Sequence, residues 1–244
     1  DTPLKKNLNP DPKILFLYSA PRGGHKSCAD AIRASFKNLY GDSIQTAGQD
    51  ISSSLSPILG PLVTRTYFEM LRLTPQIWNF IYDNPDIEQA TRELRRFFNS
   101  LNGSKLTEFI RKHRPSALVC THALPCGVAA EQKKKGICSL PLIAVITDFA
   151  VHRYWTCPEV DLFIVSNKQS EKTLRSRGIP QRKIKIFGIP TSATAKTNPD
   201  DAKRKLGLDP SKPCVMLMGG THGFGPIPEL ARDLLSIRPS VQVI

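Results

Sequence analysis

Short apolar runs, each followed by small or polar residues and then by a helical pattern, recur along this chain. Residues 13–19 (KILFLYS) form the first run, and Ile32, Phe36 and Leu39 then repeat at helical spacing between about Ser27 and Tyr40. A continuous apolar run of this length is typical of a strand buried on both faces of a parallel sheet. The pattern therefore predicts a strand, a glycine turn and a helix.

The same alternation continues to about residue 187. Further strands are predicted at 117–120, 140–147, 160–166 and 184–187, and helices at 86–113 (with a break near residue 102), at about 127–135 and between the last two strands. Strands that alternate with helices favour a parallel sheet with helices on both faces. We therefore predict an α/β fold with a Rossmann-like parallel sheet.

A second unit of the same kind begins near the carboxyl end. Asn198 and the acidic residues after it predict the start of a short helix that ends near Gly207, and an apolar run at 214–218 precedes a glycine-rich loop. We predict a first domain over 1–190, a linker over 191–212 and the beginning of a second Rossmann-like domain over 213–244. We expect this second domain to be incomplete in the chain.

Residues 52–84 interrupt the alternation with dense apolar and aromatic side chains and three prolines. This composition predicts a helical insert within the first domain. Helices with Trp, Phe and Leu on one face and Arg on the other can lie in a membrane interface. Ordinary packing against the domain is the alternative.

The composition favours a folded protein that is soluble or peripheral to a membrane. Hydrophobic residues make up 40% and charged residues 23% of the chain, as in ordinary globular proteins. The longest uncharged stretches are shorter than the ~20 apolar residues of a spanning helix, and the first dozen residues lack the pattern of a cleavable signal. The six cysteines show no zinc-binding spacing, so we interpret them as reduced core thiols.

The net charge of +13 is concentrated in residues 101–244, chiefly at 133–135, 168–185 and 203–205. Such a field favours an anionic partner, either a nucleotide, an anionic membrane surface or a nucleic acid. A basic surface without a specific ligand is the alternative for any one cluster. The aromatic residues gather away from the basic half, and we therefore expect no nucleic-acid partner.

Residues that directly follow the strands are the candidates for chemistry, because ligands of open α/β sheets bind at the carboxyl ends of the strands. These residues are Gly23, Gly24 and His25, then Thr121 and His122, then Asp148, Ser166 and the loop from Gly219 to Gly225. Glycines at such positions let backbone N–H groups approach an anion. Neither loop matches the dinucleotide or P-loop fingerprints, which disfavours a nicotinamide or flavin cofactor.

Three of the candidates, His25, His122 and Asp148, have side chains that can gain or lose a proton. The start of a helix favours the neutral form of His25, which suits proton acceptance, although helix capping is an alternative. His122 is either a ligand-binding residue or an ordinary turn histidine. A carboxylate such as Asp148, after the most apolar strand, is costly unless it is paired or functional. His152 and Trp155 follow in a loop rich in aromatic and basic groups.

Together these positions resemble the monogalactosyldiacylglycerol synthase and processive diacylglycerol glucosyltransferase family, whose members have the GT-B fold. The resemblance extends over about residues 13–230. It is carried by Gly24-His25, Thr121-His122, residues 145–149 (VITDF) with His152 and Trp155, residues 187–190 (FGIP), and residues 218–223 (MGGTHG) with Gly225. Arg22 stands where plant-like members have the first of three glycines.

The resemblance implies an inverting transferase that moves a hexose from UDP-glucose or UDP-galactose to diacylglycerol. It implies His25 or Asp148 as the base, and acceptor contacts from Gly23, Gly24, His122, His152 and Trp155. The implied donor contacts are Gly219, Gly220, Thr221, His222, Gly223 and Gly225.

The resemblance also implies that no metal and no cofactor is needed, because helix dipoles and basic groups can neutralise the leaving diphosphate. It implies peripheral attachment to an anionic membrane surface at the cytoplasmic face. Two alternatives stay open: a GT-B transferase acting on a polyprenyl-linked, peptidoglycan-type acceptor, and a non-catalytic lipid-binding derivative.

Overall fold

A computed structural model of the chain describes residues 12–19, 23–51, 103–192, 198–220, 223 and 225–244. The chain divides into two units, Asp1–Ser192 and Ala193–Ile244, which are described separately. The predicted insert at 52–84 lies outside the described residues, as do Thr221 and His222.

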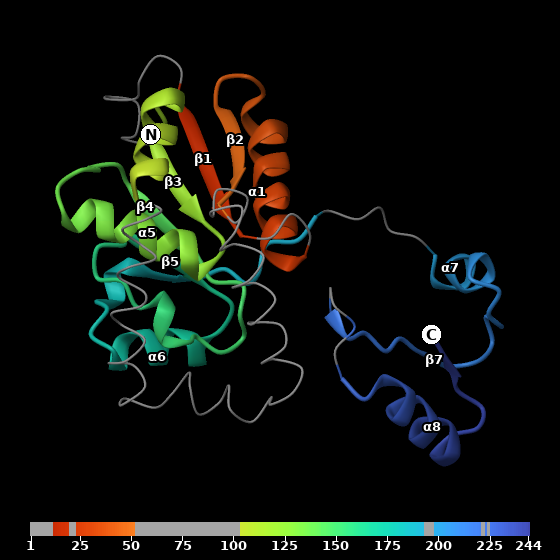
Figure 1. Ribbon diagram of the computed structural model, residues 1–244. Coiled ribbons are helices and arrows are strands. Elements are labelled where there is room, and N and C mark those ends of the chain that lie inside the picture. The colour runs from red at the N-terminus through yellow and green to blue at the C-terminus, as the bar shows by residue number, and fades with distance from the viewer. Residues whose placement is uncertain (1–11, 20–22, 52–102, 193–197, 221–222, 224) are drawn as a thin grey trace. The chain divides into compact units, whose positions relative to one another are not determined.

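The first unit is built on a six-stranded parallel sheet with the strand order β2-β1-β3-β4-β5-β6 (Figure 1). The strands are β1 (Lys13–Tyr18), β2 (Gln45–Asp50), β3 (Ala117–Cys120), β4 (Leu142–Val145), β5 (Leu162–Val165) and β6 (Ile184–Ile186). The order reverses direction between β1 and β3. The carboxyl ends of these two strands therefore form the switch point at which open α/β sheets bind ligands.

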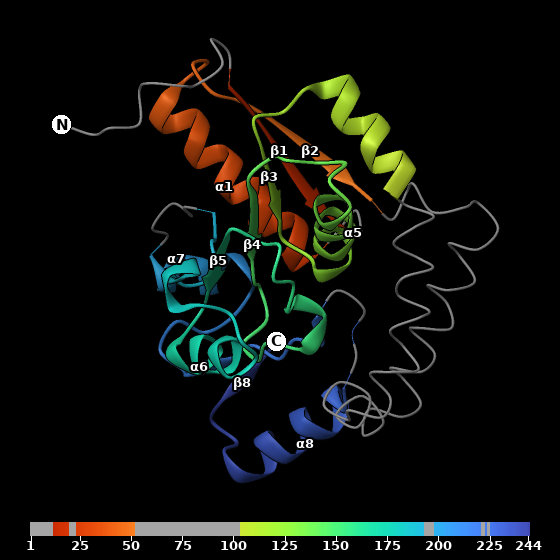
Figure 2. The same cartoon turned by 90° about the vertical axis from the view of Figure 1, so that its left-hand side faces the viewer.

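Helices cover both faces of this sheet, with α1 (Gly24–Tyr40) opposite α5 (Ala123–Lys134), as Figure 2 shows. Helix 103–113 and α6 (Lys168–Ser176) pack on the α5 face through Leu106 and Leu174. The 3-10 helices η3 (Arg153–Trp155) and η4 (Gln181–Lys183) complete the unit.

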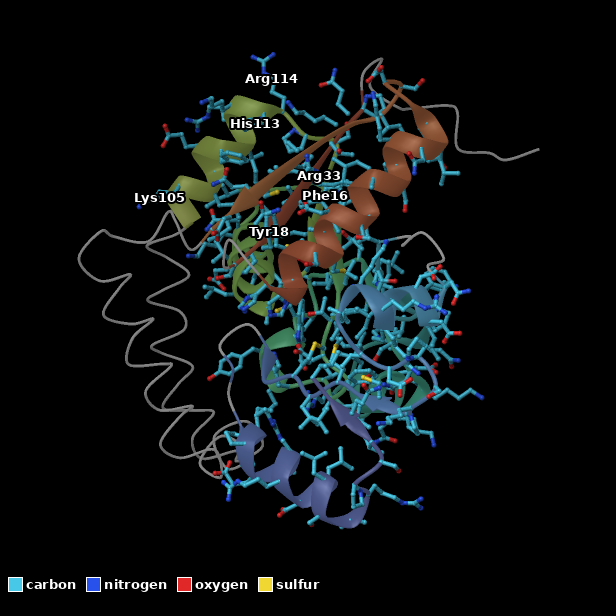
Figure 3. The ribbon with its side chains drawn as sticks, turned by 90° about the vertical axis from the view of Figure 1, so that its right-hand side faces the viewer. Phe16, Tyr18, Arg33, Lys105, His113 and Arg114 are labelled. Carbon is cyan, nitrogen blue, oxygen red and sulfur yellow. The ribbon has the colours of Figure 1, made fainter. Side chains whose placement is uncertain are left out.

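The last four residues of strand β1 are all buried, and they point alternately to the two faces of the sheet. Leu15 and Leu17 belong to the core under α5, whereas Phe16 and Tyr18 belong to the core under α1. Figure 3 labels Phe16 and Tyr18 on the side of the sheet that carries Arg33 of α1. Since successive side chains of a strand point to opposite faces, this continuous apolar run fills two cores at once.

The structure confirms the predicted parallel sheet, with two differences in its elements. Strand β2 was not predicted, because its sequence QTAGQD has no apolar run and it pairs with β1 alone at the edge of the sheet. Helix α5 begins at Ala123, before the predicted start near 127. His122 caps it, and Pro125 is tolerated in a first helical turn.

The second unit contains α7 (Pro199–Lys205), β7 (Cys214–Val215), α8 (Ile227–Ile237) and β8 (Gln242–Val243). Strands β7 and β8 are parallel neighbours joined through α8, which is the strand–helix–strand order of a Rossmann-like unit. Asn198 caps α7 as predicted, because its side chain accepts a hydrogen bond from the Asp200 N–H at 2.9 Å.

Two composition-based expectations can be compared with the described residues. All six cysteines are free. Five of them are buried, as expected of core thiols, whereas Cys214 in β7 is only partly buried. Across the described part of the chain, every helix is too short or too polar to span a bilayer.

Candidate functional site

The carboxyl ends of β1, β3 and β4 bring together side chains that are far apart in the sequence. The His25 and His122 rings are in edge-to-face contact, with their centroids 4.4 Å apart. His152 Nε2 lies 3.4 Å from Asp148 Oδ2, and a positive charge on His25 would stabilise the Asp148 carboxylate. Four residues predicted to be functional thus form one cluster at the switch point.

The hydrogen bonds of His25 identify the nitrogen that carries its proton. His25 Nδ1 lies 2.9 Å from the Thr121 carbonyl oxygen and 2.8 Å from Thr147 Oγ1. A carbonyl oxygen can only accept, so Nδ1 must donate and Nε2 keeps its lone pair. The buried Thr121 hydroxyl donates to the His25 backbone oxygen at 2.8 Å, which fixes the first turn of α1 to the end of β3.

His122 has the opposite arrangement. Its Nδ1 accepts the Leu124 N–H at 3.1 Å and caps α5, so the proton of the neutral ring lies on Nε2. Burial, assisted by the neighbouring His25, lowers the pKa of His122 to about 3. His122 therefore stays neutral near pH 7 and presents an N–H group, whereas His25 presents a lone pair.

Asp148 is held as a carboxylate by two donors. The Trp155 indole N–H donates to Asp148 Oδ2 at 2.7 Å, and His152 lies against the same oxygen. Burial raises the pKa of Asp148, but the hydrogen bonds from His152 and Trp155, with the electrostatic interactions with His152 and His25, outweigh it, so the pKa lies below its usual value. A carboxylate with a lowered pKa is a weak base.

The loop after β4 is attached to α6 through its backbone. The Phe149 carbonyl accepts from Asn167 Nδ2 at 3.2 Å and from Ser170 Oγ at 3.0 Å, and the Val151 carbonyl accepts from Arg177 at 2.9 Å. Asp148 therefore occupies a fixed position, while the Phe149 ring beside it is 78% exposed.

Trp155 lies in the core with an exposed fraction of 0%. Its position favours a role in holding Asp148 over direct contact with an acceptor, and His152 shares that role. The predicted acceptor contacts of these two residues stay predictions.

The two glycines before His25 differ in whether their backbone conformation requires glycine. Gly23 has φ 110° and ψ −177°, a backbone region that is essentially restricted to glycine. Gly24 is helical, and a Cβ atom there would meet no heavy atom within 4 Å. Gly24 thus borders open space at the amino end of α1, and the acceptor-binding role of both glycines stays a prediction.

The glycine loop of the second unit connects β7 to α8. Gly220, Gly223 and Gly225 have φ values of +67°, +65° and +115°, which favour glycine at each position. Gly219 precedes them, and Thr221 and His222 lie outside the described residues. The donor-binding role of this loop stays a prediction. In the described ranges, no group of three or more His, Cys, Asp or Glu side chains has the geometry of a metal site.

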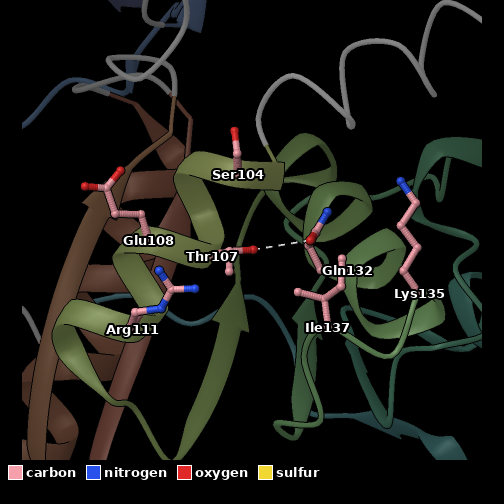
Figure 4. Close-up of a pocket in the computed structure, with 7 residues that line it drawn as sticks. All are labelled: Ser104, Thr107, Glu108, Arg111, Gln132, Lys135 and Ile137. Carbon is pink, nitrogen blue, oxygen red and sulfur yellow. Dashed lines mark hydrogen bonds between the residues drawn. The ribbon is translucent and has the colours of Figure 1, made fainter.

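A hollow of about 600 Å³ lies away from this cluster, between helix 103–113 and the carboxyl end of α5 (Figure 4). Its lining residues are Ser104, Thr107, Glu108, Arg111, Gln132, Lys135 and Ile137. Thr107 donates to Gln132 Oε1 at 3.3 Å across it. The hollow contains none of the predicted functional residues, since His122 is at the opposite end of α5.

Sequence reasoning did not assign a role to Thr147, which contacts His25 directly. The signal that could have indicated this role is positional. Thr121 and Thr147 are the first polar residues after the apolar runs of β3 and β4, and such residues line the ligand-binding edge of a parallel sheet.

Comparisons with known proteins agree with the predicted family. Residues 25–191 match the family model described as monogalactosyldiacylglycerol (MGDG) synthase. The chain is 28% identical over 236 residues to a probable chloroplastic monogalactosyldiacylglycerol synthase of Glycine max, covering 91% of this chain and 43% of that protein. It is 24% identical over 237 residues to a processive diacylglycerol beta-glucosyltransferase of Bacillus cereus, covering 96% and 60%. The chain thus spans about half the length of these curated relatives.

Solved structures share the fold at low sequence identity. Anabaena Alr3699/HepE in complex with UDP has a TM-score of 0.52 and 14% identity, covering 95% of this chain and 68% of that one. UDP-GlcNAc 2-epimerase from Neisseria meningitidis, bound to UDP-GlcNAc, has a TM-score of 0.52 and 12% identity, covering 95% and 64%. The predicted GT-B type of Rossmann-like fold is confirmed.

Proposed function

Because the chain belongs to the monogalactosyldiacylglycerol synthase family, we propose that it transfers a hexose from a UDP-sugar to diacylglycerol, with inversion at the anomeric carbon. The soybean and Bacillus relatives are named for such glycolipid products. A structural relative has been solved with UDP and glucose, the two parts of UDP-glucose. UDP-glucose is one of the two donors that we propose, and UDP-galactose is the other.

The observation that carries the proposal is the free lone pair of His25 at the switch point of the sheet. In the proposed step, Nε2 takes the proton of the diacylglycerol hydroxyl as its oxygen bonds to the anomeric carbon. The bond from that carbon to UDP breaks, and its electron pair leaves with the diphosphate. The proton stays on His25.

The neighbours of His25 favour it over Asp148 as the base. Asp148 is already engaged by Trp155 and His152, and its lowered pKa makes it a poor proton acceptor. Its negative charge would instead stabilise the imidazolium that forms on His25. His122 stays neutral because its pKa is about 3, so it does not oppose that positive charge.

We assign donor binding to Gly219, Gly220, Thr221, His222, Gly223 and Gly225. The strand–glycine–helix order of β7, this loop and α8 supports the assignment, because backbone N–H groups and a helix amino end favour a diphosphate. This scheme includes no metal and no cofactor.

We further propose that the protein acts as a peripheral protein at an anionic membrane surface, on the cytoplasmic face. This proposal is supported by exposed basic residues on α6, η4 and β6, namely Lys168, Lys172, Arg175, Arg182 and Lys185. Such residues attract anionic lipids. Phe149 and Phe187, exposed by 78% and 74%, are available to apolar parts of a lipid.

The test uses a version of the chain that also carries the carboxyl-terminal length of its curated relatives. We expect glycolipid from diacylglycerol vesicles with UDP-glucose or UDP-galactose. His25→Ala should lower kcat by about 10²- to 10⁴-fold, the usual contribution of a general base. Asp148→Asn should lower kcat by a smaller factor. His113→Ala in helix 103–113 serves as the matched histidine control.

Three results would contradict the proposal in different ways. Absence of glycolipid from both donors rejects the transferase activity. Preference for a polyprenyl-linked acceptor favours the peptidoglycan-type alternative. Vesicle binding without any binding of UDP-sugar favours the non-catalytic lipid-binding alternative.

A further inference from the structure

The base proposed above is oriented without a carboxylate. In a Ser-His-Asp triad an aspartate accepts the Nδ1–H of the histidine and fixes the tautomer. Here Nδ1 of His25 faces two neutral oxygens, the Thr121 carbonyl at 2.9 Å and Thr147 Oγ1 at 2.8 Å. The nearby carboxylate, Asp148, accepts from Trp155 instead.

We propose that Thr147 is the positioning residue of His25, its hydroxyl oxygen sharing the Nδ1–H with the Thr121 carbonyl so that Nε2 keeps its lone pair. The catalytic use of Nε2 rests on the function proposed above. The tautomer and the hydrogen bond do not depend on that function.

The positions of the three atoms determine the direction of each hydrogen bond. Thr147 Oγ1 lies 3.5 Å from the Thr121 carbonyl oxygen, to which its own proton is directed. Its lone pairs then accept from His25 Nδ1. The reverse tautomer would place the Nδ1 lone pair 2.9 Å from the carbonyl oxygen, and two acceptors at that distance repel each other.

Thr121 and Thr147 contribute in different ways. Thr121 acts on the ring through its carbonyl, while its hydroxyl donates to the His25 backbone oxygen. Thr147 acts through its side chain. A substitution at Thr147 can therefore remove one acceptor of the Nδ1–H and leave the backbone contact in place.

The consequence for catalysis concerns the protonated ring. When Nε2 takes a proton the ring becomes a cation, and a hydrogen bond to a cation is stronger than one to a neutral ring. Loss of the Thr147 oxygen therefore destabilises the protonated ring of His25 more than the neutral ring. The pH profile of the reaction should change as well as its rate.

The first experiment measures the tautomer in the 244-residue chain. After labelling with ¹⁵N-histidine, two-bond ¹H–¹⁵N correlation spectra distinguish Nδ1–H from Nε2–H, and the spectrum of His25→Ala identifies the signals of His25. We expect Nδ1–H for His25 and Nε2–H for His122. An Nε2–H tautomer at His25 in the wild type would overturn the proposal, whatever the activity of the protein.

The second experiment compares Thr147→Val with Thr147→Ser in the version used for transferase assays. The valine variant keeps the side-chain shape and lacks the hydroxyl. We expect kcat to fall by about three- to tenfold, as for the loss of one hydrogen bond, with an unchanged KM for the UDP-sugar. The acid limb of the kcat/KM profile should move to lower pH, and the serine variant should restore both rate and profile.

The outcomes separate this proposal from the proposed function. A valine variant with the wild-type rate and pH profile, or a serine variant as impaired as valine, contradicts a positioning role. If the valine variant does not fold, the serine variant and the wild-type tautomer still decide. If the wild type lacks transferase activity, the proposed function fails, while the tautomer spectra still test the hydrogen bond.

Discussion

Buried His122 should make the first unit sensitive to acid at pH values where most carboxylates remain ionised. The perturbation is His122→Asn, which removes the titrating ring. An asparagine oxygen can still accept the Leu124 N–H at the start of α5, and asparagine is a good N-cap residue. The variant thus separates the charge of residue 122 from its capping role.

The size of the effect follows from the difference in pKa between the folded and unfolded states. The pKa of His122 is about 3 in the folded protein and about 6.5 in an unfolded chain. Because the folded pKa is the lower one, the unfolded state binds the proton more readily. The stability is therefore fully present above about pH 6.5 and is lost as the pH falls towards the folded pKa.

At pH 4.5 the unfolded state is almost fully protonated at this residue and the folded state is almost unprotonated. The loss relative to pH 7.5 is then about 2 to 3 kcal/mol, at about 1.4 kcal/mol for each pH unit below the unfolded pKa. It depends chiefly on the unfolded pKa, because the folded state binds almost no proton at this pH.

The assay is urea unfolding at pH 7.5 and at pH 4.5, followed by tryptophan fluorescence. Both tryptophans, Trp78 and Trp155, belong to the first unit. Between pH 7.5 and pH 4.5, the free energy of unfolding of the wild type should fall by about 2 to 3 kcal/mol more than that of His122→Asn. His113→Asn is the control. Slight burial and nearby lysines also lower the pKa of His113, but by less than the pKa of His122 is lowered, so this variant should stay close to the wild type.

The reasoning is refuted if His122→Asn loses as much stability between pH 7.5 and pH 4.5 as the wild type. In that case His122 is either already charged in the folded protein or exposed enough to accept a proton there.

Four other substitutions test the site. Gly23→Ala should cost about 1–3 kcal/mol of unfolding free energy, because its backbone region is restricted to glycine, whereas Gly24→Ala should be neutral or stabilising; equal melting temperatures would contradict this. Trp155→Phe should raise the pKa of Asp148, measured by NMR titration, and destabilise the protein by about 1.5–3 kcal/mol in urea unfolding at pH 7.5 through the lost hydrogen bond; an unchanged titration would contradict it. Phe149→Ala should raise the KM for diacylglycerol vesicles and leave kcat unchanged, because its exposed ring is proposed to contact the lipid; an unchanged KM would exclude that contact.

The central strands could be predicted from the sequence because their burial leaves an apolar run. Strands β1, β3, β4 and β5 are buried between helices, and their residues show this directly. Strand β2 leaves no such signal, because it is an edge strand with polar residues along its length. Its Gly48 borders Arg33 and Tyr18, a contact that depends on the packing of α1.

The site was predictable in its position and less so in its contacts. His25, His122 and Asp148 could be identified because each lies in the segment that follows a strand. The partners of His25 lie 96 and 122 residues away, and only the register of the sheet brings them together. The aromatic density around Trp155 could not distinguish a core residue from a ligand contact, because a tryptophan in a loop can point either way.

The contact between His25 and the Thr121 carbonyl has a consequence for how the family can diverge. A main-chain oxygen is present whatever residue occupies position 121, so a substitution such as Thr121→Ser, which also keeps the hydroxyl bond to the His25 backbone oxygen, leaves this hydrogen bond intact. A distant relative that lacks threonine at this position can therefore keep the same histidine tautomer. Sequence change at position 121 is thus weak evidence for loss of the base, whereas an insertion that displaces the turn would be strong evidence.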